Sequence, residues 1–363
     1  MKVLYADLEH EWRGGQSQAL LTLKGLREQG HQPELLAVKG SPVAERVSAA
    51  GITVHRVGRL ASRLHAALAL RRLIARGGYD VLHLNEPHAL TSAWLAKSFR
   101  KVPLFLSRRI GFPLWKNPIS RARYAAIDMF LASSETVAQS LIDSGIPSNK
   151  ITIVNEGVPI PPLFTQGERM NARNHWGIRE NEFLFGCVSV FVPEKGQRHL
   201  IEALPAVRAV HPEVRLLLPG DGACRASVET LARELNQTDA VIIPGFITNV
   251  DQVYAALDGY VFPSEFEGLG TALLVAMAAG LPCISTNRGA LREVVDHNRT
   301  ALVAEPTGKE FAAAMLKLIG EKSLQKRLGE AGRREIEQRF SAEKMAATTA
   351  RAYQEVLKKR RTA

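Results

Sequence analysis

The chain has 363 residues, of which 46% are hydrophobic and 23% charged, enough for two ordinary domains with full cores. No apolar run approaches the ~20 residues that a membrane-spanning helix needs, and the first residues lead straight into a predicted strand, so we expect neither a membrane span nor a secretory signal. The formal net charge of +11 excludes an acidic, solvating chain and favours anionic partners.

Strand and helix patterns alternate through the first half of the chain. Short apolar runs predict strands at 2–6, 32–38, 53–57, 79–85 and 102–107, and a further one ending at 132. Between them, apolar residues at helical spacing predict helices at 16–29, 41–50, 60–75, 89–99 and 135–144. This alternation favours a parallel sheet covered on both faces.

The second half begins the same pattern again at Glu182. Its predicted strands are 183–192, 214–218, 240–243, 259–262, 282–286 and 301–303. Its predicted helices are 199–210, 227–235, 250–257, 271–279, 291–295, 309–319, 323–338 and 342–359. The Pro-rich stretch 155–162 separates the halves, so we expect an α/β protein with two doubly wound, Rossmann-like domains that face a cleft.

Basic residues gather in one part of the first half. Fourteen lysines and arginines lie between Arg56 and Arg123, opposed only by Asp80 and Glu86. Such a belt favours an anionic phospholipid surface, a glycolipid or a nucleic acid, and a solvated face that only maintains solubility is the alternative. Nucleic acid is disfavoured because aromatic residues at recurring spacing and recognised binding modules are missing from the sequence.

The stretch from Pro263 to Pro282 carries the strongest chemical signal. A short apolar strand leads into a turn with Gly268 and Gly270, and an apolar helix then runs to Gly280. The free N–H groups at the start of such a helix form a site for phosphate. A carboxylate at the same place, Glu267, would repel phosphate, so its expected use is to accept hydrogen bonds from sugar hydroxyls.

This stretch resembles the donor-binding signature of the family 4 glycosyltransferases, retaining enzymes of the GT-B fold. Glu267 matches the first Glu of that signature, whereas Val275 stands where the second Glu is expected. The loop around Lys195 resembles the family loop whose Lys binds the donor diphosphate, but Val190 stands where the family usually has Arg. The resemblance is strong from Phe183 to Leu357 and looser before that.

The resemblance implies a set of site residues. In the donor domain, they surround the nucleotide sugar: Lys195, Gly220, Phe246, Glu267, Gly268, Leu269, Gly270 and Thr271. In the acceptor-side domain, Gly14 and Gly15 form a second anion-binding turn, and the resemblance implies that this turn also binds the donor phosphates. Trp12 and Arg13 flank it on the acceptor side. That turn is not the Gly-x-Gly-x-x-Gly pattern of NAD enzymes.

The family's active-site His is missing from its usual place, where Arg108 and Arg109 stand; His88 is the nearest substitute. Arg109, Lys195 and Glu267 are therefore the expected catalytic groups. The aromatic and basic segment from Ile110 to Lys116 favours an interfacial anchor or an acceptor contact over simple core packing.

The resemblance implies domains at 1–160 and 161–341, with a final helix at 342–363 packed back on the first. It implies transfer of a sugar from a nucleotide sugar to an anionic or lipid-linked glycan acceptor, such as a lipopolysaccharide precursor. The reaction is expected to need neither a metal nor a cofactor. The protein is expected in the cytoplasm, peripherally at the membrane. The alternative is a non-catalytic GT-B-like binding protein, because Val190 and Val275 both weaken the donor site. Arg198, Glu265 and Arg288 are candidates to compensate.

Overall fold

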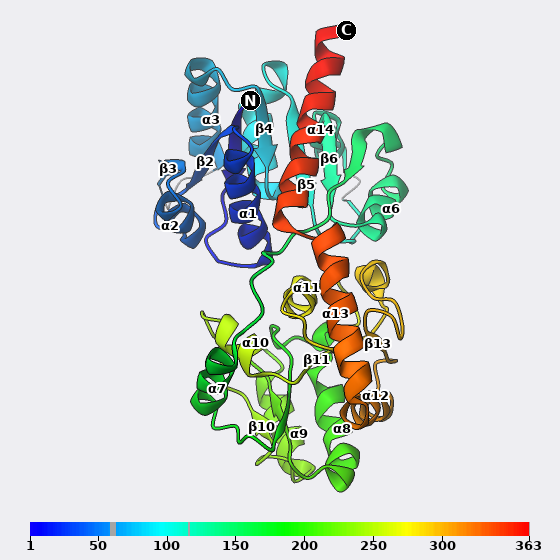
Figure 1. Ribbon diagram of the computed structural model, residues 1–363. Helices are drawn as coiled ribbons and strands as arrows, with labels where there is room; N and C mark the ends of the chain where they lie inside the picture. The colour runs from blue at the N-terminus through cyan, green and yellow to red at the C-terminus, as the bar shows by residue number, and fades with distance from the viewer. Residues whose placement is uncertain (59–62, 115–116, 363) are drawn as a thin grey trace. The chain divides into compact units, whose positions relative to one another are not determined.

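The computed structural model describes residues 1–58, 63–114 and 117–362, and the chain divides into two compact units (Figure 1). Unit 1 comprises Met1–Gly157 with Ser341–Ala363, and unit 2 comprises Val158–Phe340. The expected start of the third helix at residue 60, and the residues Arg59, Trp115 and Lys116, lie outside the described residues.

Unit 1 is built on a seven-stranded parallel sheet in the order β3-β2-β1-β4-β5-β6-β7. Its strands are β1 (Lys2–Asp7), β2 (Gln32–Val38), β3 (Thr53–Val57), β4 (Val81–Leu84), β5 (Leu104–Arg108), β6 (Met129–Ala132) and β7 (Ile151–Ile153). Its helices are α1 (Gly14–Glu28), α2 (Pro42–Ala49), α3 (Arg63–Gly77), α4 (Pro87–Leu95), α5 (Pro118–Ala125), α6 (Glu135–Asp143) and α14 (Ala342–Thr362).

Strand β1 shows how the two faces of this sheet are covered. Successive side chains of a strand point to opposite faces. Leu4 and Ala6 belong to the core formed with α3, α4 and α6, whereas Val3 and Tyr5 belong to the cores formed with α14 and with α1 and α2. The last helix of the chain therefore completes the first unit, beside α1.

Unit 2 repeats the design with a six-stranded parallel sheet in the order β10-β9-β8-β11-β12-β13. Its strands are β8 (Phe183–Gly186), β9 (Val214–Leu217), β10 (Val241–Ile242), β11 (Gly259–Phe262), β12 (Cys283–Ser285) and β13 (Leu302–Val303). Its helices are α7 (Gln166–His175), α8 (Gln197–Val210), α9 (Arg225–Glu234), α10 (Asp251–Ala256), α11 (Thr271–Ala278), α12 (Gly308–Gly320) and α13 (Lys322–Arg339). The α/β class and the two Rossmann-like sheets expected from the sequence are confirmed.

Several predicted elements were wrong in extent. The strand expected at 183–192 ends at Gly186. Beyond it, backbone N–H groups still bond to the chain after β9, but Gly220 and Gly222 there have φ values of 142° and 152°, and regular pairing stops. The helix expected at 89–99 begins two residues earlier, because Glu86 caps it and Pro87 occupies its first position, and it ends at Leu95, just before Lys97 at a φ of 55°.

The sequence analysis overlooked β7 and α7 and expected an α-helix at 291–295, where the chain forms the 3-10 turn Gly289–Glu293.

Two of the three free cysteines, Cys187 and Cys283, are buried as expected. None of the helices in the described part of the chain has the length and apolar character needed to cross a bilayer.

Candidate functional site

Each sheet has one point where the order of its strands reverses. In unit 1 this point lies between β1 and β4, and in unit 2 it lies between β8 and β11. Ligands of open parallel sheets bind outside the carboxyl ends of the strands at such a point. The predicted site residues fall into two groups, one in each unit.

In unit 2, the loops that follow β8 and β11 are held in close contact. Gly196 adopts a φ of 66°, and a Cβ atom there would lie 2.5 Å from the carbonyl oxygen of Pro263. The carbonyl of Glu194 accepts hydrogen bonds from the backbone N–H of Glu265 and from the hydroxyl of Ser264. Only glycine allows this approach, which fixes the position of the neighbouring Lys195.

Lys195 and Glu267 meet across these two loops. The Nζ atom of Lys195 lies 2.5 Å from Oε1 of Glu267, and the two side chains are 19% and 11% exposed. The ion pair is therefore largely shielded from water and stronger than a surface pair. A phosphate that binds Lys195 must compete with this carboxylate.

The start of α11 lies in the same loop, after Gly270 at a φ of 83°. This end of the helix carries the positive end of the helix dipole, and Gly270 and Thr271, both predicted as donor-binding residues, lie at it. Leu269 is only 1% exposed and belongs to the core, so it offers a ligand its backbone rather than its side chain. Gly268 lies between Glu267 and Leu269 in this loop.

Gly220 and Phe246 lie at the carboxyl ends of the neighbouring strands β9 and β10. The N–H of Gly220 bonds to the carbonyl of Gly245, so the two loops are joined. The Phe246 side chain is 70% exposed. An exposed ring beside a joined pair of loops is available to stack on a flat ligand.

The two departures from the expected pattern offer no polar side chain. Val190 is 48% exposed in the loop after β8, and Val275 packs partly against the core of unit 2. The three residues considered as substitutes already have partners: Arg198 pairs with Glu202, Glu265 with His199 and Arg288 with Glu305. The Lys195–Glu267 pair is thus the charged centre of this site.

In unit 1, the reversal point is filled by a buried polar network around Asp7, the last residue of β1. Its carboxylate accepts hydrogen bonds from Gln16 Nε2 at 3.0 Å, Asn85 Nδ2 at 2.6 Å and the backbone N–H of Glu9 at 3.0 Å. Burial raises the pKa of Asp7. Asn85 also donates to the carbonyl of Gly15, which ties the glycine turn to β4.

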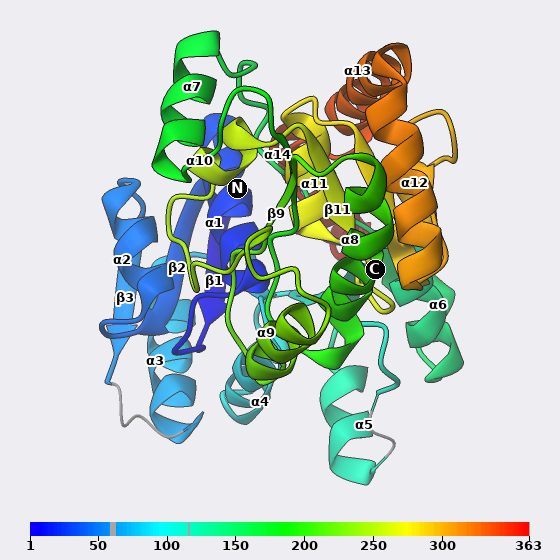
Figure 2. The same cartoon turned by 90° about the horizontal axis from the view of Figure 1, so that it is seen from below.

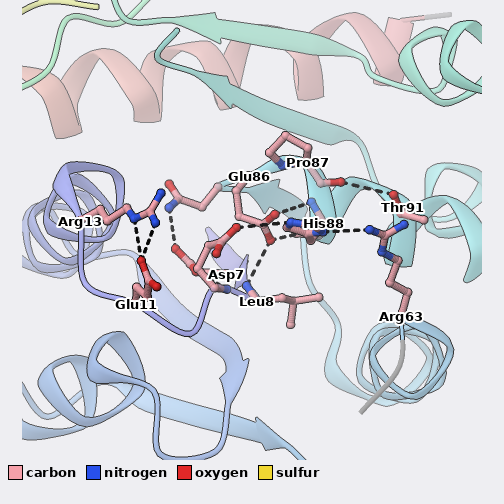
Figure 3. A network of polar contacts seen from close by, with 12 residues as sticks. Asp7, Leu8, Glu11, Arg13, Arg63, Glu86, Pro87, His88 and Thr91 are labelled. Atoms are coloured by element: carbon pink, nitrogen blue, oxygen red, sulfur yellow. Dashed lines mark hydrogen bonds and ion pairs between the residues drawn. The ribbon is translucent and has the colours of Figure 1, made fainter. Parts of the chain in front are cut away.

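Glu86 lies next to this network and caps α4 (Figure 3). Its carboxylate accepts hydrogen bonds from the backbone N–H groups of Leu8, His88 and Ala89. Burial, together with the nearby Asp7 carboxylate, raises the pKa of Glu86 to about 8. This residue was not predicted as part of the site; its place directly after a buried strand was the available signal.

Glu9, Glu86 and His88 bring three possible metal-ligand atoms within 4.8 Å of one another, although the sequence analysis found no such cluster. The oxygens of Glu86 already accept three N–H groups, and Arg63 Nη2 lies 3.2 Å from Nδ1 of His88 (Figure 3). A guanidinium at this distance opposes a second cation. Glu86 therefore caps α4 and joins it to the loop that follows β1.

Arg109 lies beside Gly15 at the end of β5. Its guanidinium donates to the carbonyl of Asn85 at 3.3 Å and to Ser107 Oγ at 3.4 Å, and its Nε lies 3.6 Å from Glu156 Oε1. A Cβ atom placed on Gly15 would lie 3.9 Å from Nη1 of Arg109. Arg109 and Gly15 are therefore brought together as one cationic corner of unit 1.

The other predicted acceptor-side residues are more scattered. Trp12 packs under the guanidinium of Arg46 on α2, and Arg13 pairs with Glu11 before α1. Gly14 opens α1 with free space around it. Arg108 donates to the carbonyl of Phe112. His88 is half exposed and faces Glu9.

Sequence analysis missed a buried chain of side chains next to Arg109. His83 lies inside β4, where its Nε2 is 2.7 Å from Ser107 Oγ and its Nδ1 contacts the hydroxyl of Tyr353 on α14. Burial, helped by the nearby Arg109 charge, lowers the pKa of His83 well below its usual value. His83 is therefore neutral at physiological pH.

Both halves of the chain match known family models. Residues 12–160 match the model described as "Glycosyltransferase Family 4", and residues 168–335 match "Glycosyl transferases group 1". The putative glycosyltransferase EpsD of Bacillus subtilis is 30% identical over 285 residues, which cover 73% of this chain and 74% of that protein. N-acetyl-alpha-D-glucosaminyl L-malate synthase of Bacillus anthracis is 26% identical over 308 residues, covering 81% and 80%.

Solved structures share the fold. A glycosyltransferase from Rickettsia africae superposes with a TM-score of 0.87 at 21% identity, over 98% of both chains. Anabaena Alr3699/HepE, solved in complex with UDP and glucose, superposes with a TM-score of 0.83 at 18% identity, over 97% of this chain and 99% of that one. The chain belongs to glycosyltransferase family 4 and is a glycosyltransferase of the GT-B fold.

Proposed function

We propose that this enzyme transfers a sugar from a nucleoside-diphosphate sugar, with retention at the anomeric carbon, to an anionic or lipid-linked glycan acceptor of the cell envelope. The observation that carries the donor assignment is the shielded Lys195–Glu267 pair beside the start of α11. The relatives support the substrate class: Anabaena HepE was solved with UDP-glucose, and the Bacillus anthracis relative is named as a synthase of a glucosaminyl compound.

The proposed donor chemistry follows from charge. When the bond between the anomeric carbon and the phosphate oxygen breaks, its electrons leave with the nucleoside diphosphate. The oxygen of the acceptor hydroxyl forms the new bond to the anomeric carbon, and its proton passes to the departing diphosphate. Lys195 and the positive end of the α11 dipole would stabilise the charge that develops on the leaving group. Glu267, released from Lys195 by the phosphate, would then accept hydrogen bonds from the donor sugar.

On the acceptor side, we propose that the Gly14–Gly15 turn and Arg109 bind an anionic group. Arg109 carries a fixed positive charge, and its guanidinium is held by Asn85, Ser107 and Glu156. Trp12, Arg13, His88 and Arg108 are proposed to contribute outside this corner. The chemistry proposed here needs neither a metal nor a cofactor, and the protein is expected to act in the cytoplasm at the membrane surface.

The test is a panel of nucleoside diphosphates and nucleotide sugars, measured by isothermal titration and by donor hydrolysis. We expect one nucleotide to bind, and we expect Lys195→Ala to weaken that binding about tenfold or more, because a hydrogen bond to a charged group contributes about 1.5–3 kcal/mol. Arg198→Ala is the matched control, since this exposed cation three residues away pairs with Glu202. If no nucleotide bound to the wild-type protein, the proposed donor class would be wrong.

A further inference from the structure

One face of unit 1 combines exposed apolar side chains with arginines. On α3, Leu64 and Leu68 are 61% and 51% exposed and lie one helical turn apart, followed by the exposed Arg71 and Arg72. On α5, Ile119 is 64% exposed. We call the exposed side chains of these two helices the α3–α5 face; its cations are Arg63, Arg71, Arg72, Arg76 and Arg121.

The positive charge of this face is not neutralised locally. Neither α3 nor α5 contains an acidic residue. The two acidic residues of the surrounding belt are used elsewhere: Asp80 accepts the backbone N–H of Lys2, and Glu86 is buried as the cap of α4. Among the described residues, no carboxylate lies within ion-pair distance of Arg71, Arg72, Arg76 or Arg121.

The two helices lie on the same side of unit 1. Helix α4 packs against both of them, and Figure 2 shows the N-terminal ends of α3 and α5 along one edge of the unit, with α4 between them. Leu64 and Ile119 belong to the first turns of these two helices. The exposed apolar side chains therefore belong to the ends that lie along this edge.

We propose that the α3–α5 face binds the surface of a bilayer that contains anionic phospholipid. The arginines would contact lipid phosphates, and Leu64, Leu68 and Ile119 would enter the boundary between headgroups and acyl chains. A merely solvated face would not need exposed leucines among the arginines, and a nucleic acid would gain little from aliphatic side chains. This inference rests on the proposed function only in that a lipid-linked acceptor gives the face its use.

The test is flotation of the full-length protein with vesicles of phosphatidylcholine alone or with about one-third phosphatidylglycerol. We expect binding only to the anionic vesicles, and weaker binding as ionic strength rises. Arg71→Gln/Arg72→Gln is expected to weaken partitioning about 30-fold, since each arginine near an anionic surface contributes about a fivefold change. Leu64→Ser/Leu68→Ser is expected to weaken it about tenfold or more.

Matched controls remove the same side-chain types from unit 2. Arg233→Gln/Arg334→Gln takes away two exposed arginines, and Val210→Ser replaces a side chain that is 62% exposed; neither is expected to change partitioning. Equal losses in the controls, or no binding to anionic vesicles, would overturn the proposal. So would a result in which the same arginines retain duplex DNA but not vesicles. Flotation needs no donor, so the proposed function is judged separately by nucleotide binding.

Discussion

The two strand-reversal points have the same topology but are built in different ways. In unit 2 the point between β8 and β11 is formed by loops that glycines bring into contact, with one ion pair, Lys195–Glu267, between them. In unit 1 the point between β1 and β4 is filled by side chains. Two of them, the buried Asp7 and Glu86, already accept three hydrogen bonds each.

This difference separates two ways to prepare a site. Backbone N–H groups and a single cation suit a ligand with a constant part, such as a diphosphate, because they recognise charge rather than shape. A network of satisfied side chains instead fixes the positions of the loops around it. The first design is sensitive to loss of one charge or one glycine, and the second to changes in pH.

The largest expected effect is on turnover in unit 2. Lys195→Ala is expected to lower kcat/KM about 100-fold or more, because it removes a positive charge aimed at the leaving group. It also leaves Glu267, 11% exposed, without its partner. In steady-state assays, the double variant Lys195→Ala/Glu267→Gln should recover thermal stability but not turnover. Recovery of both would mean that Lys195 only neutralises Glu267.

The next effect concerns the close approach of the two loops in unit 2. Gly196→Ala is expected to destabilise the protein by about 2–3 kcal/mol, since the new Cβ would clash with the Pro263 carbonyl and the residue would keep a positive φ. Gly14→Ala in unit 1 is the control, because nothing lies within 4 Å of its added Cβ. Chemical denaturation measures both, and equal stability of the two variants would contradict the comparison.

The third effect is a pH dependence that belongs to unit 1. Glu86 has a pKa of about 8 in the folded protein, compared with about 4.5 when unfolded. Between these values the folded state binds more protons, so stability should fall as pH rises, by at most about 1.4 kcal/mol per pH unit.

Glu86→Gln should flatten this slope between pH 5 and pH 8, whatever constant loss of stability it causes. Asp7, whose pKa is also raised, contributes in the same direction and should remain as a residual slope. Glu9→Gln, a neighbouring and partly exposed carboxylate, is the control. An unchanged slope in Glu86→Gln, measured by denaturation across this range, would show that Glu86 is ionised throughout.

The smallest expected effect is tighter nucleotide binding when Val275, which stands where the family signature has Glu, is replaced. Val275→Glu should tighten nucleotide binding about fivefold, because a new charged hydrogen bond would outweigh the cost of a carboxylate at a partly buried position. Val275→Gln, measured in the same titration, separates charge from size. Unchanged binding in Val275→Glu would mean that this position does not reach the donor.

Local signals in the sequence were enough to predict the strand, the turn and the helix end around α11 in unit 2. The apolar strand Gly259–Phe262, the turn glycine Gly270 and the stop at Gly280 were placed correctly, because each depends on neighbouring residues alone. Glu267 was selected from its place beside the predicted helix start, and Lys195 through the family resemblance. Their direct contact was not predicted, because it depends on how closely Gly196 and Pro263 approach.

What the sequence analysis missed depends on distant or weak signals. Tyr353 meets His83 across 270 positions of the chain, and nothing in either neighbourhood indicates the other. Strand β7 has only three residues at the edge of its sheet. Helix α7 had a usable signal, since Thr165 and Glu168 form a capping box, but the helix is polar and lacks a strong apolar face.

The place of α14 has a consequence for synthesis. Domains generally fold as units while the chain emerges from the ribosome. Unit 1 needs Met345, Tyr353 and Val356 to cover Val3 and Phe105, yet these residues follow the whole of unit 2 in the chain. Unit 2 can therefore finish folding first, and the part of the protein that the ribosome makes earliest is completed last.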